Sequence, residues 1–153
     1  MSLMPESQSL SDASIIEALR KKVYKATTQR IAICRLALSS REHPTAQGIF
    51  REIKMLHPTV SLATVYKTLQ VLRELHLVQE LAFPQGETRF DLNLIPHVNV
   101  VCLQCGSVRD VNDRAVQDVV ARVASRTRFA VTRQRFDMYG ICEKCTRNTK
   151  AIP

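Results

Sequence analysis

Tryptophan is absent from this chain of 153 residues, only four residues are glycine, and no long apolar run occurs. A membrane-spanning helix needs roughly 18 consecutive apolar residues, so we expect no membrane segment. The first residues lack a basic stretch followed by an apolar one, and we therefore predict a cytoplasmic protein without a signal peptide. No glycine-rich phosphate loop, nucleophile elbow or open zinc site with a paired base is present, so we do not expect an enzyme.

Positive charge is plentiful and unevenly distributed. Lys and Arg number 22 against 14 Asp and Glu, for a net charge of +8, which favours a polyanionic partner. Seven basic residues and no acid lie between Arg20 and Arg41, and five more lie without an acid between Val119 and Phe136. We interpret the second block as a solvated face. The first block matters more because a predicted DNA-reading helix follows it.

Apolar spacing in the first half predicts four helices. Their expected starts are Ser11 or Asp12, the break at Ala26-Thr27, Thr45 and Ser61, and their apolar stripes run as far as Val23 in the first and Leu56 in the third. Residues 77–83 and 88–92 then alternate like the strands of a hairpin around the turn at 84–87. Helices followed by a hairpin indicate a winged helix-turn-helix. The alternative is a plain helical domain with a basic surface.

The fourth helix would read DNA. It places apolar residues on one side and small, polar, aromatic and basic ones on the other, which suits contact with bases and phosphates. Together with the first basic block, it gives the predicted DNA-contacting residues Lys22, Tyr24, Lys25, Arg30, Ser61, Thr64, Tyr66 and Lys67.

The second half has a different pattern. We expect strands at 98–103 and 108–111, a helix capped by Asp113, and an extended segment over 128–138. The predicted class is α+β. A winged-helix domain spans residues 1–92, with 1–10 flexible, a hinge spans 93–97, and a small α/β domain spans 98–153.

Four of the five cysteines form two CxxC pairs, Cys102 with Cys105 and Cys142 with Cys145. Each pair can present two thiolates from a tight turn, and two pairs complete a tetrahedral site for a structural Zn²⁺. Two disulfides and an iron–sulfur cluster are the alternatives, and both are less expected in a cytosolic chain. Cys34 stands alone in an apolar stripe and is expected to be a core thiol.

Taken together, these features resemble the ferric uptake regulator (Fur) superfamily of metal-dependent transcription factors. The resemblance covers roughly residues 15–147. The matching segments are Thr28-Gln-Arg30, His43-Pro-Thr-Ala46, the run from Ser61 to Leu69, Gly86 to Leu92, Pro96-His97, Val101 to Gly106, and Tyr139 to Cys145. It implies a DNA-binding domain, a C-terminal dimerisation domain, and a homodimer on a palindromic operator in double-stranded DNA.

The resemblance also implies a regulatory Fe²⁺ or Mn²⁺ ion between the two domains. Carried over residue by residue, the ligand positions are His43, Asp91, His97, Asn99 and Asp110. Asp at 91 and 110 resembles the peroxide-sensing PerR branch, in which a ligand histidine is oxidised. Asn99 departs from the histidine of that pattern. The alternatives are an iron or manganese homeostasis regulator, or a constitutive zinc-containing DNA-binding protein whose sensory site does not function.

Overall fold

The computed structural model describes residues 11–40, 43–83 and 86–149, and the chain divides into two compact units. One unit comprises Met1–Ala82 with Glu87–Leu92, and the other Phe83–Gly86 with Asn93–Pro153. The expected flexibility of residues 1–10 and the first half of the turn expected at 84–87 lie outside the described residues. No helix in the described ranges is both long and apolar enough to cross a membrane.

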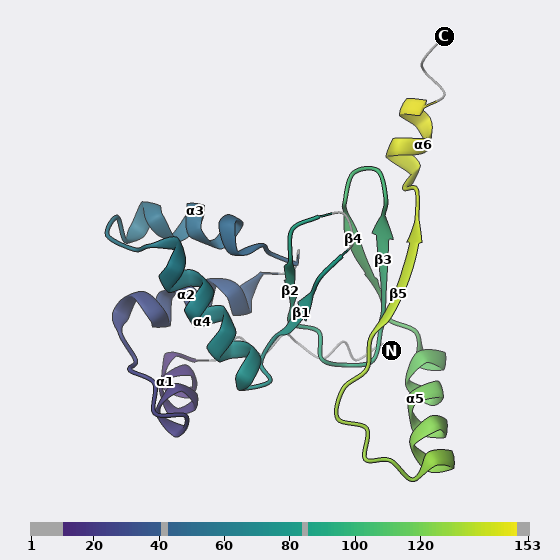
Figure 1. Ribbon diagram of the computed structural model, residues 1–153, viewed down its shortest axis with the longest axis horizontal. Helices are drawn as coiled ribbons and strands as arrows, with labels where there is room; N and C mark the ends of the chain where they lie inside the picture. Colours follow the sequence, from purple (N-terminus) through teal and green to yellow (C-terminus); the bar gives the residue numbers. More distant parts are fainter. Residues whose placement is uncertain (1–10, 41–42, 84–85, 150–153) are drawn as a thin grey trace, which may run out of the picture. The chain divides into compact units, whose positions relative to one another are not determined.

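The first unit is a helical bundle followed by a short hairpin (Figure 1). The hairpin strands β1 and β2 are antiparallel, with Glu80 opposite Phe90. The elements are α1 (Asp12–Lys21), α2 (Thr28–Ser39), α3 (Ala46–Leu56), α4 (Leu62–Glu74), β1 (Gln79–Leu81) and β2 (Arg89–Asp91).

Each of these four helices begins at a hydroxyl cap. In every case the side-chain oxygen accepts a hydrogen bond from a backbone N–H three residues later, which satisfies one of the otherwise unpaired donors of the first turn. The capping residues are Ser11, Thr27, Thr45 and Ser61. The expected caps at Thr45 and Ser61 are confirmed, and Ser11 rather than Asp12 caps the first helix.

The four helices enclose an apolar core. Its fully buried side chains include Ile15, Leu19, Ile33, Ile49, Ile53, Val65, Leu69 and Leu72. Two inward assignments were wrong: Val23 is 92% exposed and Leu56 is 77% exposed. Helix α1 ends at Lys21 and Val23 adopts a positive φ of 63°, so the helical period does not reach it. Leu56 is the last residue of α3, where the next turn that would bury it is missing.

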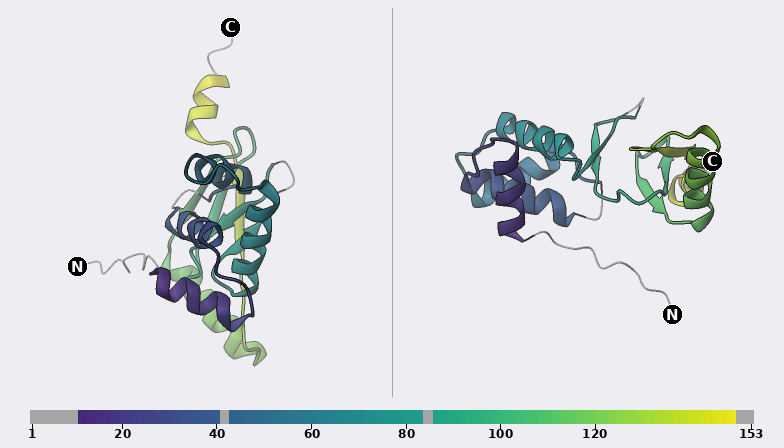
Figure 2. Two further views of the ribbon diagram at one scale, coloured as in Figure 1. Left: turned by 90° about the vertical axis from the view of Figure 1, so that its left-hand side faces the viewer. Right: turned by 90° about the horizontal axis from the view of Figure 1, so that it is seen from below.

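The second unit is built on a three-stranded sheet of order β4-β3-β5. Strand β3 pairs antiparallel with β4 and parallel with β5, and α5 connects β4 to β5. Helices α5 and α6 lie at opposite ends of the sheet (Figures 1 and 2). The elements are β3 (Val98–Cys102), β4 (Val108–Val111), α5 (Arg114–Thr127), β5 (Phe136–Gly140) and α6 (Glu143–Thr149).

The sequence predicted most of this unit. Asp113 caps α5 by accepting from the N–H of Ala115, as expected. The extended segment predicted over 128–138 is a strand only from Phe136, and Arg128 instead ends α5 in a left-handed conformation with φ 57°. Helix α6 was missed. The α+β class is confirmed by a helical N-terminal region and a small C-terminal sheet.

Candidate metal centres and DNA-facing helix

The four paired cysteines meet where the ends of β3 and β5 lie side by side. The Sγ atoms of Cys102 and Cys145 are 3.9 Å apart, those of Cys105 and Cys142 are 3.7 Å apart, and all four lie within 4.8 Å of one another. A zinc ion bound at about 2.3 Å by four sulfurs requires sulfur–sulfur separations of about 3.8 Å. A disulfide requires about 2.05 Å, and all four residues are free thiols. The arrangement therefore fits zinc.

The backbone around Cys102 prepares its sulfur to bind a cation. The N–H groups of Cys105 and Cys142 point to this sulfur and lower the pKa of the Cys102 thiol to about 6. The neighbouring Cys142 sulfur raises the pKa of Cys145 to about 12. Crowded thiolates repel one another, and a divalent cation among them removes that repulsion. Gly106, with φ 69°, makes the turn that returns the chain to β4.

Cys34 has a different environment. It is fully buried in the helical core, and burial raises the pKa of its thiol to about 12. A neutral thiol in an apolar core is a packing residue. The expectation of a core thiol is confirmed.

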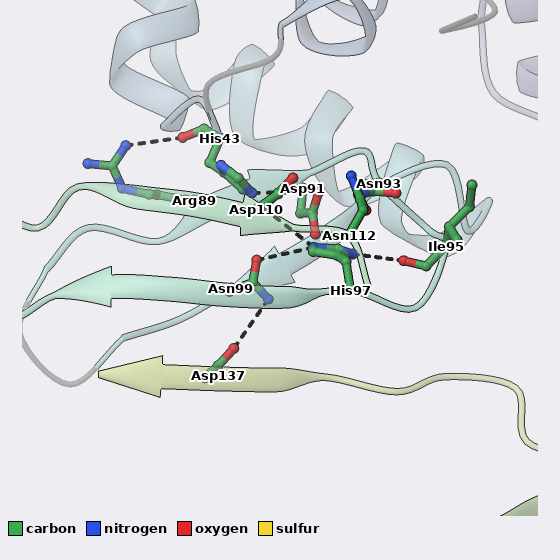
Figure 3. Close-up of polar contacts among 10 residues, drawn as sticks. All are labelled: His43, Arg89, Asp91, Asn93, Ile95, His97, Asn99, Asp110, Asn112 and Asp137. Atoms are coloured by element: carbon green, nitrogen blue, oxygen red, sulfur yellow. Dashed lines mark hydrogen bonds and ion pairs between the residues drawn. The ribbon is translucent and has the colours of Figure 1, made fainter. Parts of the chain in front are cut away.

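In the first unit, His43 lies beside Asp91. The Nε2 of His43 is 3.7 Å from Oδ1 of Asp91, and both side chains are buried. The pairing follows from a junction between the segment before α3 and strand β2. The N–H of Phe90 donates to the carbonyl of Pro44 at 3.0 Å, and Arg89 donates to the carbonyl of His43 at 3.2 Å (Figure 3).

In the second unit, His97, Asn99 and Asp110 lie together. The His97 Nε2 lies 3.3 Å from Oδ1 of Asn99 and 3.5 Å from Oδ1 of Asp110. Strand register explains the grouping, because Asn99 pairs directly with Asp110 across β3 and β4. His97 lies two residues before Asn99, directly before the start of β3, and the alternation of side chains along an extended chain places it on the same side as Asn99. Figure 3 shows these side chains and their contacts.

The group around His97 suits a first-row divalent ion. Donors bound to one ion at about 2.1 Å lie roughly 3.0–3.4 Å apart in octahedral or tetrahedral geometry, close to the two distances around His97. Imidazole nitrogen with carboxylate and amide oxygen is a donor set suited to Fe²⁺ or Mn²⁺. The Nδ1 of His97 lies 2.7 Å from the carbonyl of Ile95, and this hydrogen bond leaves Nε2 as the ligating nitrogen.

The predicted DNA-contacting residues fall into two groups. Lys22, Lys25, Tyr66 and Lys67 have exposed side chains, and Tyr66 is 49% exposed on α4. Ser61 and Thr64 form the N-terminus of α4, with their hydroxyls 2.9 Å apart. Exposed residues at the start of a helix are well placed to reach a phosphate.

Tyr24 and Arg30 instead bind other residues of the same unit. The Tyr24 hydroxyl donates to Glu74 at 2.7 Å, which raises the pKa of the tyrosine. Arg30 donates to the carbonyl of Lys25 at 2.6 Å, and its guanidinium lies over the Tyr24 ring. These contacts fix the segment between α1 and α2.

The sequence did not point to a second layer of polar residues behind Asn99. Asp137 on β5 accepts from the Asn99 amide nitrogen at 3.3 Å, and Arg135 and Tyr139 both bind Asp137. Only the parallel register of β3 and β5, which places Asn99 opposite Asp137, would have indicated this contact. Register between strands 38 residues apart is not readable from local periodicity.

The model of the ferric uptake regulator family matches residues 21–139. The peroxide-responsive repressor PerR of Staphylococcus epidermidis is 35% identical over 130 residues, which cover 85% of this chain and 87% of that protein. The Campylobacter jejuni peroxide stress regulator has a similar structure, with a TM-score of 0.70, 31% identity, and coverage of 86% of this chain and 98% of that one. The Helicobacter pylori ferric uptake regulator shares the fold, with a TM-score of 0.75, 20% identity, and coverage of 90% and 95%. The chain belongs to the ferric uptake regulator family.

Proposed function

We propose that this protein is a metal-dependent transcriptional repressor that binds a palindromic operator in double-stranded DNA as a homodimer in the cytoplasm. Its similarity to PerR repressors over most of both chains supports this function. The exposed Tyr66 and Lys67 on α4 supply side chains for base and phosphate contact. The apolar side chains left exposed on the second unit, among them Val119, Val123 and Met138, support a dimer interface.

One structural Zn²⁺ ion per subunit is held by Cys102, Cys105, Cys142 and Cys145 in this proposal. The sulfur spacing supports it. Four thiolate ligands leave no open coordination position, so the ion would act by holding the ends of β3 and β5 to the start of α6. Enzymatic chemistry at this centre is not part of the function.

The regulatory ion, Fe²⁺ or Mn²⁺, is proposed to join the two units. The first unit would contribute His43 and Asp91, and the second His97, Asn99 and Asp110. The observation that carries this proposal is that each unit already places an imidazole beside a carboxylate, at 3.7 Å in one and 3.5 Å in the other. Residues 93–97 would act as the hinge. Metal binding would then favour the relative orientation that grips DNA, a population shift set by occupancy.

Peroxide sensing is the signal that we propose. A bound Fe²⁺ ion would supply the redox chemistry that activates hydrogen peroxide; in the net reaction one peroxide oxygen would enter a ring C–H bond of a ligand histidine, which is oxidised by two electrons, and the other would leave as water. His43 and His97 are the candidates, because they are the imidazoles in the two groups. Oxidation removes a ligand, so repression would end.

Oxidation mapping tests this signal. The zinc-loaded protein is purified without oxygen, loaded with Fe²⁺, treated with stoichiometric peroxide, and analysed by peptide mass. We expect one added oxygen on His43 or His97 and loss of DNA binding, with His57 as an internal control that stays unmodified. Unmodified His43 and His97, together with reversible metal-dependent DNA binding, would instead assign the protein to metal homeostasis.

A further inference from the structure

We propose that Asp137 is a positioning residue that holds the Asn99 amide so that its oxygen faces the regulatory metal. This inference rests on the proposed function and deepens it. Asn99 stands where the resemblance expects a histidine, so the question is what makes an asparagine a ligand at this point of β3. The answer lies on the neighbouring strand.

The hydrogen bond from Asn99 on β3 to Asp137 on β5 sets the orientation of the Asn99 side-chain amide. The Asn99 Nδ2 donates to Oδ1 of Asp137 at 3.3 Å, and the Asn99 Oδ1 lies 3.3 Å from His97 Nε2. An ionised carboxylate only accepts hydrogen bonds, so rotating the amide by 180° would set two oxygens against each other. The amide oxygen is therefore held toward His97, as Figure 3 shows.

Asp137 is itself held on its other side. Its Oδ2 is 2.7 Å from Arg135 and accepts a hydrogen bond from the Tyr139 hydroxyl at 3.2 Å. The Arg135 guanidinium lies 5.1 Å from the centre of the Phe83 ring, within the same unit. With one oxygen occupied by these two donors, the other remains directed at Asn99. The positioning carboxylate thus has a defined orientation of its own.

The Nε2 of His97 lies beside the Asn99 amide oxygen and could bind the same metal ion. A carbonyl can only accept, so the Nδ1 of His97 must donate to Ile95, and its Nε2 faces the oxygens of Asn99 and Asp110. A metal ion bound at Nε2 would also be within reach of both oxygens. His97, Asn99 and Asp110 therefore direct three ligand atoms at one point, and Asp137 sets which atom of Asn99 takes part.

The consequence concerns the choice of metal. A neutral amide oxygen is a harder donor than imidazole nitrogen, and hard oxygen donors suit Mn²⁺. Fixing the oxygen inward biases this half of the site toward Mn²⁺ relative to Zn²⁺. Removing the carboxylate lets the amide rotate and presents its NH₂ group, which cannot ligate, to the ion.

A double-mutant cycle on the full-length, zinc-loaded protein tests the proposal, with Mn²⁺ affinity as the measurement. Asp137→Ala should weaken Mn²⁺ binding about 10–100-fold, the usual loss for a residue that orients a ligand. In an Asn99→Ala background, the same substitution should change affinity less than twofold. Asp118→Ala, which removes an exposed carboxylate from α5 of the same unit, is the charge-matched control and should leave affinity unchanged.

Equal losses from Asp137→Ala in both backgrounds would mean that Asp137 merely supports the fold, and no loss in either would also overturn the proposal. The second readout is the Asn99 side-chain amide NMR signal without the regulatory metal, which should show a hydrogen-bonded NH₂ that is lost in Asp137→Ala. A wild-type protein that keeps this signal yet binds no Mn²⁺ would place the failure in the proposed function. An amide signal unaffected by Asp137→Ala would overturn the positioning role whatever the metal result.

Discussion

The two units differ in what holds them together. In the first, helices α1 to α4 bury a continuous set of aliphatic side chains, many of them fully. In the second, α5 buries no residue, and the buried apolar side chains among the described residues are Val101, Cys102 and Cys145. Two of these three are cysteines of the Cys₄ centre. Hydrophobic burial can stabilise the first unit alone, whereas we expect the second to depend on the proposed zinc ion and on the proposed dimer interface.

We infer from this difference in stabilisation that the two units have separate roles. The close-packed core of the first unit fixes α4 relative to the other three helices, because buried side chains have little freedom to rearrange. A sheet with little core of its own can be assembled and adjusted by ions and by a second copy. Substitutions that affect one unit and spare the other therefore test whether the two units are stabilised in different ways.

Substitution of a zinc ligand should have the largest effect. Cys142→Ser should release zinc and unfold the second unit, because the ends of β3 and β5 lose their connection. Zinc content and circular dichroism measure the change, and the helical signal of the first unit should persist. Cys34→Ala is the matched control, since it removes a cysteine from the helical core and should leave zinc bound. Retained zinc and an intact dimer in Cys142→Ser would contradict the Cys₄ assignment.

A cavity in the helical core should produce the converse result. Leu69 is completely buried on α4, and Leu69→Ala should destabilise the first unit by about 2–5 kcal/mol. Denaturant unfolding followed by circular dichroism reports this change. Zinc content and dimerisation should stay at wild-type levels. Loss of zinc in this variant would mean that the two units do not fold independently.

A charge on the exposed apolar side of α5 should weaken the dimer. Val123 is 49% exposed, and Val123→Glu should lower dimer affinity on the order of 100-fold, because a buried carboxylate at an interface lacks a partner. Analytical ultracentrifugation measures this change. Val23→Glu is the control, being an exposed valine on the first unit that should leave the dimer intact. An unchanged dimer in Val123→Glu would remove α5 from the interface.

Loss of a helix cap should have the smallest effect. Ser61 accepts from the N–H of Thr64 at 3.1 Å, and Ser61→Ala should cost about 1 kcal/mol of the stability of the first unit. Thermal unfolding measures it, and Ser61→Asp should restore most of the loss, since aspartate also caps. A cost no larger than that of Ser39→Ala, at the opposite end of a helix, would argue against a capping role.

The sequence predicted elements better than contacts between distant strands. Capping residues before apolar periods, two hydroxyls and one carboxylate, located the starts of α3, α4 and α5, because capping is a local interaction. Val23 and Leu56 were misassigned because periodicity does not say where a helix ends. Strand β5 begins at Phe136, later than expected, because a local pattern does not show which extended residues pair with another strand.

The candidate sites divide in the same way. The CxxC spacing alone identified four sulfurs that the structure brings together. The regulatory ligand set was found only by resemblance, because its members are scattered over 68 residues and no spacing relates them: His43, Asp91, His97, Asn99 and Asp110. Asp137 was missed by both routes, since its role depends on the register of β5 against β3.

Metal-dependent DNA binding tests the central claim most directly. A duplex selected from a random pool by the Mn²⁺-loaded protein is titrated with zinc-loaded protein, with and without Mn²⁺. We predict that Mn²⁺ tightens wild-type binding about 10–100-fold, and that His43→Ala, with zinc retained, removes this dependence. Equal wild-type affinity with and without the ion would contradict a regulatory metal that joins the two units.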